Sequence, residues 1–294
     1  MTNTSEQIDM PDLRLLPVEN LVFHEHADEK RVERMEARLM VDGYLKNPPI
    51  VASIPDTERF VVLDGANRTS ALIGLGCKHI LAQVVDYKSN RVQLLTWHHL
   101  ITGRKPVNFL QEISRVEGLV LRPLQLKLAR AALASRAILA YIAVPVSEEQ
   151  GKSAVFTVDG VEGTEHNDAE KSTALLNALV DTYKGDPQVA IHRTNTDDLD
   201  ELYDYYSDIS GIVVFPPYTP DDILRLAQAG NKVPTGITRH IISHRALRVN
   251  VPVSLLAGEQ SLADKTAWWQ EQMRIKLASN EVRLYQESTY LFDE

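Results

Sequence analysis

Short apolar runs alternate with amphipathic stretches of helical spacing along most of this chain. In segment 28–42, apolar residues recur at the intervals that place them on one helix face, and Gly43 follows as a stop. The apolar runs 50–54 and 60–63 flank a turn that contains proline and aspartate, which is typical of a hairpin. This alternation predicts an α/β (α+β) fold.

The same patterns predict the other elements. We expect strands at 21–23, 79–85, 92–97, 154–158, 189–191, 212–215 and 241–253, and helices at 68–74, 109–117, 124–140, 168–183, 220–230 and 263–277. A polar break at 148–152 indicates a boundary. The sequence therefore predicts an α/β domain over 1–105, a helical connector over 106–150 and a mixed α/β domain over 151–294.

Composition narrows the class of protein. The 294 residues carry a formal net charge of −9, which argues against a nucleic-acid-binding protein, because phosphate binding needs an excess of Lys and Arg. Cys77 is the single cysteine, so an internal disulfide is excluded and we expect a buried thiol. The polar start lacks a secretory pattern and no run is long and apolar enough for a membrane span, so we expect a cytoplasmic protein.

The clearest local motif is the strand, turn and helix start at 61–70, VVLDGANRTS. The first turn of a helix offers unpaired N–H groups, and Gly65 lets the backbone approach a ligand closely. Arg68 can clamp two phosphate oxygens, and Asp64 can hold a magnesium ion that bridges phosphates. The motif indicates a phosphate site. The alternative, in which Asp64 and Asn67 only form a turn and a helix cap, stays open.

Two clusters of titratable side chains follow predicted strands. The run 24–26, His-Glu-His, can supply a general base or metal ligands, with Glu25 pointing away from the side that its two neighbours share. The alternative is an exposed polar loop. Trp97 can stack on a small ligand beside His98 and His99, or it can be a core residue next to surface histidines.

Cations and hydroxyls gather in the last third of the chain. The cluster comprises segment 234–240 with Arg239, followed by Arg245, Arg248 and Asn250. In an acidic chain such a cluster can bind an anion, or it can neutralise a carboxylate-rich neighbour such as 197–198. On this clustering alone, we expect Arg239 and Arg245 to contact substrate or phosphate.

Three motifs resemble the ParB/sulfiredoxin-like fold and, within it, the free L-serine kinases, including their siderophore-linked branch. They are Phe23-His24-Glu25, the strand entry Asn47-Pro48-Pro49-Ile50-Val51, and the turn Leu63-Asp64-Gly65 with Arg68. The similarity covers residues 13–100, and a looser likeness extends to 236–240 and 245–250. It implies a ParB/sulfiredoxin-like nucleotide-binding domain that transfers a phosphoryl group from ATP or ADP to the hydroxyl of free L-serine, giving O-phospho-L-serine.

The resemblance also implies roles. Glu25 matches the family's catalytic acid, a general base on the serine hydroxyl, and Asp64 matches the acid beside the transferred phosphate and its Mg²⁺. Trp97 matches an aromatic residue of the amino-acid pocket, which His98 and His99 are expected to line with it. The turn is expected to bind the nucleotide phosphates through Gly65, Ala66, Asn67, Arg68 and Thr69.

The sequence departs from the family where Ala66 and Asn67 replace two histidines. Asn67 can still donate from its side chain, whereas Ala66 offers only its backbone N–H. Threonine or homoserine stays open as the acceptor. Two other functions also stay open: a ParB-type DNA-binding regulator with a helix-turn-helix within 109–140, and a non-catalytic sensor of a nucleotide, an amino acid or haem.

Overall fold

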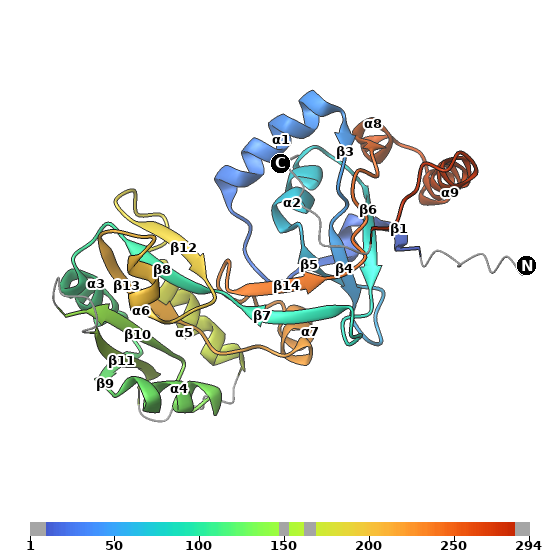
Figure 1. Cartoon of the computed structure of the whole chain (residues 1–294). Helices are drawn as coiled ribbons and strands as arrows, with labels where there is room; N and C mark the ends of the chain where they lie inside the picture. Colours follow the sequence, from blue (N-terminus) through green and yellow to red (C-terminus); the bar gives the residue numbers. More distant parts are fainter. Residues whose placement is uncertain (1–9, 147–152, 162–168, 286–294) are drawn as a thin grey trace, which may run out of the picture. The chain divides into compact units, whose positions relative to one another are not determined.

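The computed structural model describes residues 10–146, 153–161 and 169–285, and Figure 1 shows the course of the chain. Among these residues, no helix is both long enough and apolar enough to cross a membrane. The predicted polar break at 148–152 lies outside the described residues.

The chain forms two compact units. The first contains 10–22, 27–92 and 242–285, and the second contains 23–26 and the described part of 93–241. This division differs from the three predicted segments in two respects. The chain after 241 returns to the first unit, and the predicted connector contributes strands to the sheet of the second.

A five-stranded sheet forms the core of the first unit. In spatial order its strands are β1 (Asp12–Pro17), β6 (His79–Val85), β4 (Ile50–Ser53), β5 (Phe60–Asp64) and β2 (Leu21–Phe23). β4 and β5 pair antiparallel with Ser53 opposite Phe60, which confirms the predicted hairpin. Apolar residues such as Val51, Val61 and Ile80 are fully buried, because these strands lie in the middle of the unit.

Helices α1 (Glu29–Asp42) and α2 (Ala66–Gly74) pack against each other in this unit. The Asp28 carboxylate accepts a hydrogen bond from the Arg31 N–H and so caps α1, and Gly43 ends the helix in the left-handed conformation. The predicted helix and its stop are therefore confirmed. The remaining elements are η1 (Val18–Asn20), β3 (Tyr44–Leu45), β15 (Val251–Pro252), α8 (Val253–Ala257) and α9 (Leu262–Ala278).

A six-stranded sheet forms the core of the second unit. In spatial order its strands are β12 (Ala190–Thr194), β8 (His98–Thr102), β13 (Ile209–Val214), β10 (Ala140–Pro145), β11 (Ser153–Gly160) and β9 (Leu119–Pro123). Neighbouring strands are antiparallel. Strands β7 (Val92–Thr96) and β14 (Thr238–Ile242) pair with each other in a separate two-stranded sheet. The helices are α3 (Pro106–Ile113), α4 (Leu126–Ala134), α5 (Ala169–Asp181), α6 (Leu199–Tyr203) and α7 (Pro220–Gln228).

Three predicted elements are wrong in extent. The helix expected at 124–140 ends at Ala134, because Arg136 adopts a positive φ of 58° and β10 begins at Ala140. The helix expected at 109–117 ends at Ile113. Most of 241–253 is irregular, with His244, Arg248 and Asn250 at positive φ, a backbone conformation that lies outside the β region of regular strands.

A helix-turn-helix, which the alternative of a DNA-binding regulator requires, does not form within 109–140. Strand β9 lies between α3 and α4 in the chain and pairs with β11 in the six-stranded sheet. The two helices are therefore not joined by the short turn of a helix-turn-helix. Cys77 is buried, as predicted, and burial raises the pKa of its thiol to about 11. A thiol in that state is unreactive at neutral pH.

Candidate active site

The predicted site residues fall into two groups, one in each unit, and each group is described by itself. The first surrounds Asp64 at the end of β5 and includes Arg245. The second surrounds Glu25 and includes Trp97 and Arg239.

Asp64 ends β5, and its side chain is 42% exposed. Its Oδ2 accepts a hydrogen bond from Arg245 Nη1 at 2.9 Å. Gly65, with a φ of 87°, turns the chain so that α2 begins at the next residue. A carboxylate, a cation and the N-terminus of a helix therefore meet at one end of a strand, an arrangement that suits a phosphate with a metal ion.

Two buried amides hold the segment that carries Arg245. Gln83 donates from Nε2 to the His244 carbonyl and accepts the Ala246 N–H at Oε1, each at 2.9 Å. Asn47 Oδ1 accepts the Arg248 N–H at 3.0 Å. These side chains bind the backbone where strand pairing was predicted, and they fix Arg245 beside Asp64.

The side chains of two other residues of the turn form hydrogen bonds within the first unit. Thr69 is fully buried and donates its hydroxyl to the Gly65 carbonyl at 3.0 Å. Asn67 Oδ1 accepts the N–H of Asp28 at 2.9 Å, which ties α2 to the start of α1. Ala66 is the first residue of α2, and Gly65, the N-cap, makes no side-chain hydrogen bond. The predicted cap by Asp64 or Asn67 is therefore not formed.

Gly65 allows a test of how tightly this turn is built. A Cβ at Gly65 would lie 3.2 Å from Pro49 Cα, whereas one at Gly43 would meet nothing within 4 Å, although both residues have positive φ. We expect Gly43→Ala to cost about 1–2 kcal/mol of unfolding free energy through backbone strain alone. Gly65→Ala should cost clearly more, as measured by urea denaturation. Equal losses would contradict the close contact.

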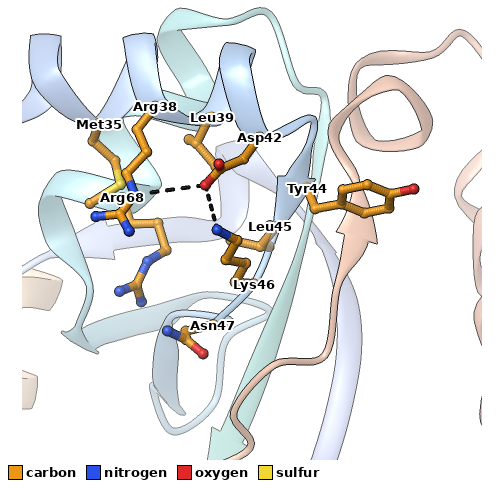
Figure 2. Close-up of a pocket in the computed structure, with 9 residues that line it drawn as sticks. All are labelled: Met35, Arg38, Leu39, Asp42, Tyr44, Leu45, Lys46, Asn47 and Arg68. Atoms are coloured by element: carbon orange, nitrogen blue, oxygen red, sulfur yellow. Dashed lines mark ion pairs between the residues drawn. The ribbon is translucent and has the colours of Figure 1, made fainter. Parts of the chain in front are cut away.

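A hollow beside this turn is lined by cations (Figure 2). It contains about 350 Å³ of space, including its open mouth, and its lining is Met35, Arg38, Leu39, Asp42, Tyr44, Leu45, Lys46, Asn47 and Arg68. Asp42 pairs with Lys46 at 2.8 Å and with Arg38 at 3.7 Å. Three cations face a single carboxylate, so the hollow carries a net positive charge that favours an anionic ligand.

Glu25 is held by one short segment of the second unit. Its Oε2 accepts the Gly236 N–H at 2.9 Å, and its Oε1 accepts the Thr238 N–H at 3.0 Å and the Thr238 hydroxyl. The side chain is 15% exposed. Neutral donors of segment 234–240 therefore hold the Glu25 carboxylate, whereas Asp197 pairs with Arg130 at 2.6 Å.

The histidines beside Glu25 have different surroundings. His24 is 4% exposed and its Nε2 lies 2.9 Å from Thr238 Oγ1, whereas His26 is exposed. The extended-chain pattern predicted that these two side chains share one side of the chain, but one is buried and the other is exposed. Within the described part of the chain, no group of three His, Cys, Asp or Glu side chains is placed to hold a metal ion.

Trp97 and Arg239 are brought together. The Arg239 guanidinium lies 4.1 Å from the centre of the Trp97 ring, and the backbone N–H of Trp97 donates to the Ile237 carbonyl at 2.8 Å. Both side chains are partly exposed. Stacking on an indole holds a guanidinium flat and leaves its edge for a carboxylate or a phosphate.

His98 and His99 form hydrogen bonds with residues around the Glu25 group. His99 is buried, its Nδ1 lies 2.9 Å from the Tyr183 hydroxyl, and it also bonds to the backbone of Gly236. His98 Nδ1 accepts the Phe215 N–H at 3.3 Å. Burial lowers the pKa of His99 to about 3 and that of His98 to about 4, so both rings are neutral at physiological pH.

Several residues of the two groups were not predicted from the sequence. Arg38 and Lys46 line the hollow, and their only sequence signal is charge on a helix and after it. Arg193 lies against Gly236, where a Cβ would meet its Nη2 at 2.6 Å. Gly236 has a φ of 82°, a backbone conformation that favours glycine.

Comparisons with known proteins bear on these two groups. No family model matches the chain. The chain is 23% identical over 287 residues to the ATP-dependent L-serine kinase SbnI of Staphylococcus aureus. The aligned region covers 96% of this chain and 97% of the relative. It is 32% identical over 105 residues to an ATP-dependent L-serine kinase of Staphylothermus marinus, covering 36% of this chain and 41% of the relative. An ADP-dependent L-serine kinase, SerK of Thermococcus kodakarensis, is 26% identical over 108 residues, 37% of this chain and 44% of the relative.

The solved structures with a similar fold include kinases of the same kind. A C-terminally truncated SbnI from Staphylococcus aureus superposes with a TM-score of 0.67 at 20% identity, covering 90% of this chain and 97% of that one. A free serine kinase variant in complex with AMP superposes with a TM-score of 0.68 at 18% identity, covering 84% and 94%. The chain has the fold of these kinases. The predicted mixed α/β class is confirmed by this likeness.

Proposed function

We propose that this protein is a free L-serine kinase that transfers a phosphoryl group from ATP or ADP to the serine hydroxyl, giving O-phospho-L-serine. The observation that carries the proposal is the similarity to SbnI, which spans nearly the whole of both chains. The likeness to a free serine kinase structure that holds AMP supports a nucleotide as the donor. Phosphoryl transfer needs positioning and charge neutralisation above all, and the two groups of residues offer both.

The nucleotide phosphates are assigned to the first unit. Arg68 lies in the first turn of α2, and its side chain lines the cationic hollow together with Arg38 and Lys46. Guanidinium and ammonium groups around a helix N-terminus are the donors that a polyphosphate needs. Arg245, held against Asp64, adds a further cation at the end of β5.

A magnesium ion fits this group as a companion of the nucleotide. Mg²⁺ in such sites is bound by one or two carboxylates together with substrate phosphates and water, so it does not need a full cage of protein ligands. Asp64 has an exposed carboxylate, and only its Oδ2 is engaged by Arg245. When bound, the ion would neutralise charge on the phosphates, and Asp64 would hold it.

The amino acid is assigned to the second unit. Glu25, held at both oxygens, acts as the general base on the serine hydroxyl. Arg239, stacked on Trp97, binds the serine carboxylate. The neutral rings of His98 and His99 stabilise the segment behind the site and do not act as cations.

Arg239 gives a prediction for substrate binding. We expect Arg239→Ala to raise KM for serine by about 10- to 100-fold, since a charge-assisted hydrogen bond is worth about 1.5–3 kcal/mol. Arg239→Lys should recover part of the loss, because lysine keeps the charge but not the planar stack. Steady-state kinetics with varied serine measures both. Arg225→Ala removes an arginine that pairs with Asp222 on α7 and should leave KM unchanged. An unchanged KM in Arg239→Ala would remove this role.

We also assign the chain to the siderophore-linked branch of these kinases. The likeness of the motifs 236–240 and 245–250 to that branch supports the assignment, and in this structure these motifs contact Glu25 and Asp64 through Thr238 and Arg245.

The proposed function is tested by incubating the purified protein with Mg²⁺, ATP or ADP, and L-serine, L-threonine or L-homoserine in separate reactions. The phosphorylated amino acid is identified by mass spectrometry. We expect product with L-serine, and the nucleotide that supports it names the donor. Product with another acceptor alone would contradict the assignment of serine.

A further inference from the structure

The surroundings of Glu25 assign a different task to each of its oxygens. A carboxylate oxygen accepts about two hydrogen bonds. Oε1 accepts two, from the N–H and the hydroxyl of Thr238, whereas Oε2 accepts one, from Gly236. Among the described residues, no second donor reaches Oε2. One acceptor position therefore stays open on a side chain that is partly exposed.

Thr238 connects Glu25 to a buried ring. The threonine hydroxyl has a single hydrogen, and an ionised carboxylate can only accept. The Thr238 hydroxyl therefore donates to Oε1, and its oxygen accepts from His24 Nε2, which lies 2.9 Å away. His24 is 4% exposed and packs edge-on against the His240 ring at 5.4 Å between ring centres. This packing fixes the ring, and the ring fixes the hydroxyl.

From these contacts we propose that His24 and Thr238 are positioning residues for Glu25, and that Glu25 Oε2 is the atom that takes the proton from the substrate hydroxyl. Oε1 is occupied by Thr238, so it orients the carboxylate and stays out of the reaction. In the step, the hydroxyl O–H bond breaks, its proton goes to Oε2, and the oxygen forms a bond to the transferred phosphorus as the bond to the leaving nucleotide breaks. The inference rests on the proposed serine kinase activity.

A double-mutant cycle tests the proposal. Thr238→Val removes the hydroxyl at nearly constant volume, and we expect it to lower kcat by about 10- to 100-fold, a part of what a general base contributes. In the Glu25→Gln background the same substitution should change kcat by less than about twofold, because residues that act through one another are not additive. Thr238→Ser should restore most of the activity, since serine keeps the hydroxyl. KM for the nucleotide should stay constant throughout.

His24→Phe gives an independent arm if Thr238→Val fails to fold. It removes the donor to Thr238 and keeps an aromatic ring beside His240, so we expect a smaller loss of kcat that again disappears in the Glu25→Gln background. Equal losses in both backgrounds would overturn the proposal. If the wild-type protein forms no phosphoserine with either nucleotide, the proposed function itself fails, which is a different result.

Discussion

Glu25→Gln is expected to lower kcat for serine phosphorylation by a factor on the order of 10²–10⁴, the contribution of a well-placed general base. Glutamine matches the size of glutamate but cannot take a proton. Its amide also places N–H donors against the N–H groups of Gly236 or Thr238, so at least one hydrogen bond to the segment is lost. Phosphoserine formation under saturating substrates, read by mass spectrometry, gives kcat.

The control for this variant is Glu271→Gln, which makes the same chemical change in an exposed glutamate that pairs with Arg274 on α9. It should leave kcat unchanged. Nucleotide affinity, measured by titration, should also stay constant in Glu25→Gln, because Glu25 is assigned to the amino acid. A kcat close to that of the wild type would show that Glu25 is not the base.

Asp64→Asn is expected to lower kcat/KM for the nucleotide by about 10²–10³-fold, because it removes electrostatic stabilisation at the transferred phosphate. The amide is a poor ligand for Mg²⁺, and it leaves Arg245 without the carboxylate that it contacts at 2.9 Å. We therefore also expect half-maximal activity to need more Mg²⁺ in the variant. Initial rates across a magnesium titration measure both effects.

A second aspartate provides the control for Asp64. Asp12 pairs with Arg14 at 2.6 Å, and its exposure is close to that of Asp64, at 46%. Asp12→Asn therefore breaks a comparable exposed ion pair away from the proposed site and should leave the magnesium dependence unchanged. A wild-type response to Mg²⁺ in Asp64→Asn would contradict the metal assignment.

Local features of the site could be predicted from the sequence. The apolar run before Asp64 and the glycine after it set a strand, a turn and a helix start within ten residues, and the structure follows that pattern. Asp28 and Gly43 likewise mark the ends of α1. In each case the interactions that decide the structure lie between residues close in the chain.

The partners of the acidic residues could not be predicted. Arg245 lies 181 residues after Asp64, and Thr238 lies 213 residues after Glu25. Such contacts depend on how the chain returns to each unit, which no local spacing encodes. The irregular stretch 242–250 shows the same limit, because its apolar pattern predicts a strand whereas buried amides of Asn47 and Gln83 bind its backbone.

The most direct test of the kinase assignment is a stoichiometric one. Purified protein is mixed with Mg²⁺, L-serine and one nucleotide, and O-phospho-L-serine and the nucleotide product are quantified in the same sample. We predict equal amounts of phosphoserine and of ADP from ATP, or of AMP from ADP, and on the order of 10²-fold less phosphoserine, or lower still, in Glu25→Gln over the same time. Nucleotide consumption without phosphoserine, or no turnover with either nucleotide from folded protein, would contradict the assignment.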